Sequence, residues 1–159
     1  MHSEAIKSIK PVLDNPIQAF YTDKFQLFDS IQIILEQLGK KCNVLYITSF
    51  SVSEEFIRKI WRFRQNMQID KVILLLDNKA ALKVNKLLHF AKNVFDEVIL
   101  TSNHGKVILF DSSLQVSICT SQNQTRGNRR ESTIITTDKD CYRAFLSEIH
   151  NMIDVGIKL

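Results

Sequence analysis

The sequence contains few residues that interrupt regular structure, with four glycines and two prolines among 159 residues. This scarcity excludes a collagen-like or low-complexity chain. Its three cysteines, Cys42, Cys119 and Cys141, are odd in number, widely spaced and form no CxxC pair. They therefore exclude a disulfide framework and a zinc knuckle, and reduced thiols are expected. Because residues 1–7 also lack a basic region followed by an apolar stretch, we expect a cytoplasmic protein.

Long apolar runs are also missing. The run Val72–Leu76 is among the longest, far short of the roughly 20 residues that a membrane helix needs, so no membrane span is expected. Hydrophobic residues make up 45% of the chain and charged residues 24%, which is typical of a globular protein and excludes wholesale disorder. The net charge of +4 is compatible with a polyanionic partner but does not specify one.

Hydrophobic patterning predicts strands that alternate with helices in a single domain spanning residues 1–159. Residues 1–16 carry both prolines without a sustained period, so they are interpreted as a possible arm or an edge segment. Strands are expected at 17–21, 43–50, 71–76, 97–100, 106–110, 114–118 and 132–137, and helices at 28–38, 56–67, 80–91 and 142–152. This order predicts the α/β class, with a mixed, mostly parallel sheet flanked by helices.

Several common site motifs are absent. The chain has no GxxxxGK[ST], GxGxxG, HExxH or GxSxG sequence, which argues against a P-loop, a dinucleotide fingerprint, a zinc protease and a nucleophile elbow. Asp77 follows an expected strand, but no glycine-rich loop precedes it, so it is predicted to be a turn or cap residue. We predict neither a metal nor another cofactor.

A group of polar residues begins at His104. On an extended strand, His104 and Lys106 project from the same face because they are two residues apart. An imidazole nucleophile beside an ammonium group suits a phosphate ester, whose non-bridging oxygens the ammonium neutralises. Ser121 and Asn123 repeat this spacing and offer hydroxyl and amide donors to the same phosphate. If its strand lies alongside, Glu131 is expected to accept a hydrogen bond from the second ring nitrogen of His104.

These residues form an ordered pattern. His104-Gly105-Lys106, four apolar residues and Asp111 spell H-x-K-x4-D, and the segment Thr120–Asn123 is similar to the G-S-x-N that follows it. Asn128 and Glu131 match the end of the extended pattern. The pattern resembles the HKD motif of the phospholipase D superfamily, specifically its small nuclease-like members with one motif per chain. The match covers about a quarter of the chain, roughly residues 97–137.

The resemblance implies a phospholipase D-like half-domain and a metal-independent phosphodiesterase. In that mechanism one histidine attacks phosphorus to form a phosphohistidine, while a second, protonated histidine donates to the leaving oxygen and then activates water. Because this chain has one motif, the resemblance implies a homodimer in which the two copies of His104 face each other. The resemblance gives Asp111 a structural role, and its odd separation from His104 agrees, since it would point away on a regular strand.

The sequence departs from the family pattern at two places. Eight residues, 112–119, separate Asp111 from Thr120, where the family has six, and Thr120 replaces a glycine. Two additional residues preserve the facing of the strands because the side-chain period is two, so we expect the site geometry to survive. A threonine at this position nevertheless crowds backbone that approaches the phosphate. A catalytically weak or inactive nucleic-acid-binding module is therefore the alternative.

The substrate class must be inferred from other residues. Arg126, Arg129 and Arg130 follow the expected phosphate donors and are predicted to contact a nucleic-acid backbone. A phospholipid-modifying enzyme is a third possibility, although no basic amphipathic helix with an exposed aromatic edge is evident. The sequence does not distinguish DNA from RNA, nor one strand preference from another. Four more cations lie on one expected helix and are interpreted as an ordinary solvated face: Arg58, Lys59, Arg62 and Arg64.

Overall fold

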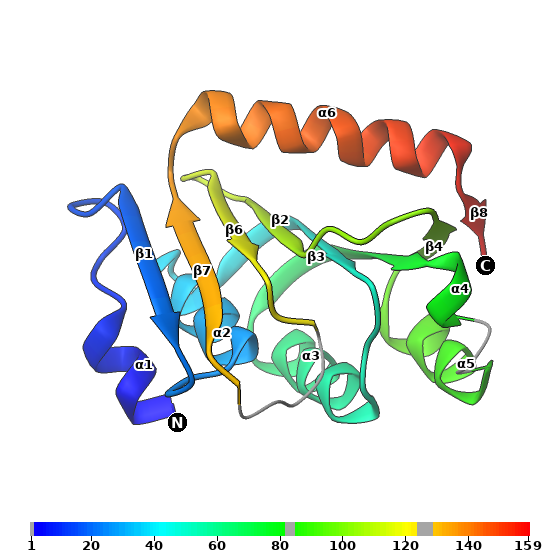
Figure 1. Cartoon of the computed structure of the whole chain (residues 1–159), viewed down its shortest axis with the longest axis horizontal. Coiled ribbons are helices and arrows are strands. Elements are labelled where there is room, and N and C mark those ends of the chain that lie inside the picture. The colour runs from blue at the N-terminus through cyan, green and yellow to red at the C-terminus, as the bar shows by residue number, and fades with distance from the viewer. Residues whose placement is uncertain (1, 82–84, 124–128) are drawn as a thin grey trace.

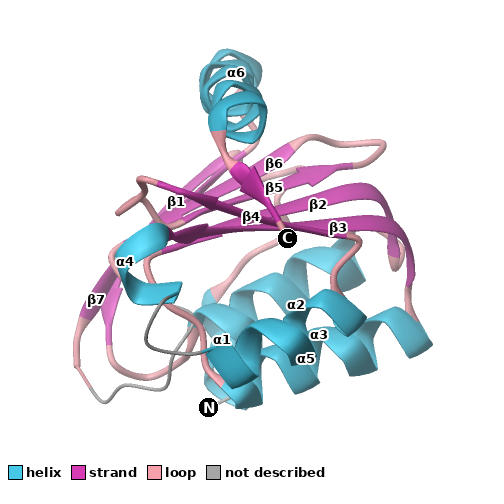
Figure 2. Ribbon diagram, turned by 90° about the vertical axis from the view of Figure 1, so that its right-hand side faces the viewer, coloured by secondary structure: helices cyan, strands magenta, loops and turns pink. Residues whose placement is uncertain are grey.

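The computed structural model describes residues 2–81, 85–123 and 129–159, which form one mixed sheet with helices on both faces (Figures 1 and 2). The strands are β1 (Ile17–Thr22), β2 (Lys41–Ser49), β3 (Gln68–Asp77), β4 (Glu97–Thr101), β5 (Val107–Asp111), β6 (Val116–Thr120), β7 (Glu131–Thr136) and β8 (Ile157–Lys158). The helices are α1 (His2–Ser8), α2 (Leu27–Gln37), α3 (Glu54–Asn66), α4 (Asn78–Ala81), α5 (Asn85–Val94) and α6 (Lys139–Val155).

The two faces of the sheet are covered unequally. Helices α1, α2, α3 and α5 lie on one face, and α6 crosses the other face alone (Figure 2). Strand β5 illustrates the division, because Ile108 and Phe110 join the core under the helical layer. Leu109 joins the smaller core that contains Tyr142 of α6. Burial on both faces explains why the central strands have continuous apolar runs instead of alternating patterns.

The strands follow the order β1-β7-β6-β5-β2-β3-β4-β8. The parallel pairs are β2 with β3 and β3 with β4, and the other pairs are antiparallel. The predicted α/β class and mixed sheet are therefore confirmed, but the sheet is not mostly parallel. Helical crossovers between β2, β3 and β4 make that part parallel, whereas residues 112–115 join β5 and β6 as a hairpin, which makes neighbouring strands antiparallel.

The first 16 residues differ from the expected arm. They contain helix α1, and Ala5, Ile9 and Val12 are buried in the core beneath the sheet. The Gln18 side chain also accepts a hydrogen bond from the Lys10 N–H, at 2.8 Å. A helix of seven residues is too short to display a sustained apolar period, so the sequence pattern did not reveal it.

Two helices begin at a residue whose side chain caps the first turn. The Ser53 hydroxyl accepts a hydrogen bond at the start of α3, and the Asp138 carboxylate does so at the start of α6. Helix α2 begins after Gln26, its N-cap residue. The expected helix over 80–91 corresponds to α4 and α5. In the described part of the chain, no helix is both long and apolar enough to cross a bilayer.

Candidate active site

His104 and Lys106 are in direct contact just before β5 begins. The Lys106 Nζ lies 3.3 Å from the His104 Nδ1 and donates to the His104 carbonyl oxygen at 2.7 Å. The imidazole is exposed, whereas Lys106 is only 8% exposed. The structure therefore joins the two residues that the sequence pattern placed at the centre of the site.

The two ring nitrogens of His104 differ in their contacts. The ring of Phe50, which follows β2, lies 5.2 Å from the His104 ring, measured between centroids. Nδ1 faces the Lys106 ammonium. An ammonium can only donate, so Nδ1 is the acceptor in this contact, and in the neutral ring Nε2 carries the proton.

Two neighbours that sequence reasoning missed hold the backbone around His104. The Thr48 hydroxyl donates to the Gly105 carbonyl at 3.1 Å and accepts from the Val107 N–H at 2.9 Å. Asn103 forms further bonds with Gly105 from the opposite side of His104 in sequence. The sequence shows only that Asn103 and Thr48 are polar residues near strand ends. Their hydrogen-bond partners depend on how β2 pairs with β5.

Ser121 and Glu131 form a second contact. The Ser121 hydroxyl donates to the Glu131 carboxylate and accepts from the Ser132 N–H. The sequence placed Glu131 next to His104 on condition that its strand lay alongside. In the structure β6 separates β7 from β5, and Glu131 bonds to Ser121. The Thr120 N–H donates to the Lys106 carbonyl at 3.0 Å, which connects this pair with the His104 side of the site.

The longer hairpin preserves the facing of the strands, as expected. Val107 is paired with Cys119, so Thr120 lies on the same face of the sheet as Lys106. The Thr120 hydroxyl is buried and donates to the Ser132 carbonyl at 2.8 Å. Asn123 is half-buried, and its Oδ1 has no hydrogen-bond partner among the described residues. The Asn123 amide oxygen can therefore accept a further hydrogen bond.

Asp111 lies on the opposite face of the sheet, toward α6. Burial raises the pKa of the Tyr142 hydroxyl, and the charge of Asp111 raises it further. The same two causes, again burial first, raise the pKa of the Cys42 thiol to about 12. Cys42 also donates to the Asp111 carbonyl at 3.4 Å. The interaction with Tyr142 of α6 agrees with the side of β5 to which parity assigns Asp111, opposite that of His104.

The predicted phosphate-binding arginines lie partly outside the described residues. Arg129 and Arg130 are exposed immediately before β7, and Arg126 falls in the segment that the structure does not describe, as does Asn128. We find no group of three histidine, cysteine or acidic side chains suited to a metal ion within 2–81, 85–123 and 129–159.

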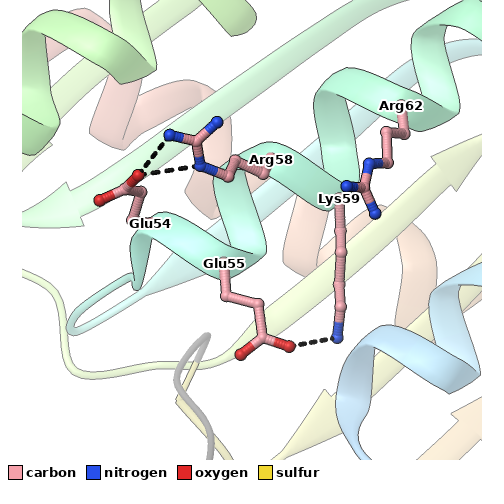
Figure 3. Close-up of a pocket in the computed structure, with 5 residues that line it drawn as sticks. All are labelled: Glu54, Glu55, Arg58, Lys59 and Arg62. Carbon is pink, nitrogen blue, oxygen red and sulfur yellow. Dashed lines mark hydrogen bonds and ion pairs between the residues drawn. The ribbon is translucent and has the colours of Figure 1, made fainter.

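The cations of α3 are largely neutralised by carboxylates (Figure 3). Arg58 pairs with Glu54 at 2.6 Å, and Lys59 pairs with Glu55 at 2.9 Å. Arg64 pairs with Asp96, on the turn before β4, at 2.9 Å. This helix therefore presents the ordinary solvated face that was expected.

This architecture is the phospholipase D fold. The chain resembles Nuc from Salmonella typhimurium, a phospholipase D family member, with a TM-score of 0.68 and 14% identity over 90% of this chain and 97% of that one. It also resembles NucT from Helicobacter pylori, with a TM-score of 0.64 and 13% identity over 90% and 98% of the two chains. The fold implied by the sequence pattern is therefore confirmed.

Other structural neighbours have different activities or functions. TrmBL2, an archaeal chromatin protein with a novel mode of DNA binding, has a TM-score of 0.56 and 12% identity over 91% of this chain and 53% of its own. Phosphatidylserine synthase from Haemophilus influenzae has a TM-score of 0.57 and 11% identity over 96% and 41%. No family model and no curated protein matches the sequence. At these identities the likeness defines the fold, so function must be argued from the site.

Proposed function

We propose that the protein is a metal-independent phosphodiesterase, a nuclease that acts through a phosphohistidine at a site shared by two subunits. The observation that carries the proposal is the contact between the His104 Nδ1 and the Lys106 Nζ. This contact supports the proposal because an imidazole can act as a nucleophile and an ammonium can neutralise a phosphate, and the fold is shared with Nuc and NucT.

The reaction has two displacements at phosphorus. A nitrogen of His104 attacks, the bond between phosphorus and the leaving oxygen breaks, and His104 of the partner subunit protonates that oxygen. Water then attacks the phosphohistidine, the partner's His104 takes the proton of that water, and the phosphorus–nitrogen bond breaks. Throughout, the Lys106 ammonium neutralises the non-bridging oxygens, and it exchanges part of its contact with His104 for the phosphate.

Other residues orient the phosphate and the nucleic acid in this proposal. Asn123 supplies an amide donor, and the Ser121 hydroxyl turns its proton from Glu131 to the phosphate when the substrate binds. Arg126, Arg129 and Arg130 bind neighbouring phosphates of a DNA or RNA backbone. Asp111 supports β5 from the α6 side. The three cysteines are free thiols, which fits the cytoplasmic location that we propose.

The test is cleavage of labelled DNA and RNA oligonucleotides in excess EDTA. We expect the purified protein to cleave at least one of them, and His104→Ala to abolish cleavage. His89→Ala serves as the matched control because His89 is exposed on α5, and it should leave the rate unchanged. Cleavage that persists in His104→Ala, or that requires a divalent cation, would overturn the proposal.

A second candidate is a nucleic-acid-binding module without turnover. Thr120 favours it, because its buried side chain occupies the place of the family's glycine beside Lys106. The likeness to the DNA-binding protein TrmBL2 also favours it. This candidate predicts salt-sensitive binding of the same oligonucleotides without cleavage. Turnover of phosphatidyl substrates with the oligonucleotides left intact would instead support a phospholipid-modifying enzyme.

A further inference from the structure

We propose that Asn103 is a positioning residue that fixes the backbone of His104 for attack on phosphorus. This inference rests on the proposed function, since it assigns a supporting group to the same nucleophile. It concerns a residue outside the H-x-K pattern, at a point where the chain has left β4 and has not yet entered β5.

The side chain of Asn103 forms hydrogen bonds around His104. Its Oδ1 accepts from the Gly105 N–H at 3.0 Å, and its Nδ2 donates to the Gly105 carbonyl at 3.0 Å. The same Nδ2 donates to the carbonyl of Ser49 at 3.3 Å. One amide group therefore fixes the peptide groups on the far side of His104 and ties them to the end of β2.

The backbone of Asn103 is fixed as well. Its N–H donates to the Asp77 carboxylate at 3.2 Å, and Asp77 is the last residue of β3. Asp77 also accepts from the Lys79 N–H at 2.9 Å, which makes it the turn residue predicted from the sequence. The ends of β2 and β3 thus hold the segment that carries His104.

This support matters because the strand ladder does not reach His104. Residues 103–106 belong to no regular element, and the His104 side chain is exposed. Without Asn103, the Gly105 N–H would lose its bonding partner, and the Gly105 carbonyl would keep only the Thr48 hydroxyl. A nucleophile must be held in a near-attack geometry, and a displacement of about 1 Å can cost roughly 100-fold in rate.

Asparagine is suited to this position by its chemistry. The contacts require an acceptor for an N–H and a donor for two carbonyl oxygens at the same reach, which a carboxamide supplies. Aspartate keeps the acceptor but directs negative charge at the carbonyl oxygens of Ser49 and Gly105. Glycine at 105 fits the same arrangement, because a Cβ there would meet the Asn103 Oδ1 at 3.3 Å.

The test compares Asn103→Ala and Asn103→Asp with the wild-type protein, with Asn15→Ala as the control. Asn15 also donates its amide to a carbonyl, that of Pro11 at 3.1 Å, at an exposed position outside the site. We expect Asn103→Ala to lower kcat on an oligonucleotide by about 10- to 100-fold and to leave KM within about twofold, because Lys106 and the arginines still bind phosphate. Asn15→Ala should change neither constant.

Hydrogen exchange of the Gly105 amide gives a readout that does not require activity. The amide should be protected in the wild-type protein, exposed in Asn103→Ala and still protected in Asn103→Asp, which retains the acceptor.

Should Asn103→Ala fail to fold, the aspartate variant decides: a lower kcat with the Gly105 amide protected supports the proposal. An unchanged kcat in a folded variant, or equal Gly105 exchange with and without the side chain, overturns it. An inactive wild type with the expected exchange pattern would refute the proposed function and the catalytic purpose of Asn103, while leaving its contacts established.

Discussion

At the scale of single residues, Lys106 combines a buried side chain with an ammonium that contacts the proposed nucleophile. Its side chain is buried, yet its ammonium contacts both the carbonyl and the ring of His104. A buried ammonium is costly unless it has hydrogen-bond partners. Both partners here belong to His104, so the same contacts that satisfy the lysine hold it beside the proposed nucleophile. A phosphate oxygen can replace either contact without leaving the charge unpaired.

Thr120 supports a residue-scale prediction about stability. Its hydroxyl donates to the Ser132 carbonyl and accepts from the Gln122 N–H at 3.2 Å, so Thr120→Val leaves a buried N–H without a partner. We expect the free energy of unfolding, measured by urea denaturation, to fall by about 1–3 kcal/mol. Thr22→Val is the control, since the Thr22 hydroxyl accepts from the Lys24 N–H in an exposed turn. Equal losses in the two variants would contradict this account of Thr120.

At the scale of elements, Glu97 joins three strands. On β4, it pairs with Lys158 of β8 at 2.9 Å and with Lys71 of β3. The bond to Lys71 and then that to Lys158 lower the pKa of the Glu97 carboxyl. A carboxyl whose pKa is lower in the folded state stabilises the fold above its unfolded pKa, and this contribution is lost as the pH falls through the folded value.

The corresponding prediction concerns Glu97→Gln. At neutral pH it should lower the free energy of unfolding by about 0.2–1 kcal/mol for each of the two ion pairs, in which the lysines are exposed and Glu97 is partly buried. The difference from the wild-type protein should shrink as the pH falls below the ordinary glutamate pKa of about 4.3. Thermal unfolding monitored by circular dichroism at several pH values measures both effects. Glu148→Gln on the exposed face of α6 is the control, and a pH-independent difference for Glu97→Gln would contradict the prediction.

The elements also show what a sequence can predict. Val72–Leu76 forms part of a strand buried on both faces, so its apolar run alone revealed it. Capping is also local, because the Ser53 and Asp138 side chains each bond within the first turn of their own helix. Strand β8 has two exposed residues, which give no periodic signal. Its position depends on pairing with β4, which local patterns do not encode.

The candidate site likewise has features that local spacing predicts and contacts that depend on the order of the strands. The sequence predicted that His104 and Lys106 project to the same side, and in the structure their side chains are in contact. The hydrogen bond between Ser121 and Glu131 was not predicted, because it depends on β6 lying between β5 and β7. Asn103 was missed for the same reason, since Ser49 and Asp77 reach it through the order of the strands.

At the scale of the whole molecule, the proposed chemistry needs a second imidazole near His104. The other three histidines lie on helices, His2 on α1, His89 on α5 and His150 on α6, where the His150 ring is 6.0 Å from that of Tyr46, measured between centroids. Tyr46 belongs to the core under α6, on the face opposite the helical layer. The second imidazole is therefore expected from another copy of the chain, with both copies of His104 at a two-fold axis.

The most direct measurement of this central claim is the activity of a mixed dimer. Wild-type and His104→Ala subunits carrying different affinity tags can be co-expressed, and the species with one of each purified through both tags. The account predicts that this heterodimer is as inactive on an oligonucleotide as the His104→Ala homodimer, because each site needs both imidazoles. A heterodimer with about half of the wild-type activity, or a wild-type enzyme that is active as a monomer, would contradict it.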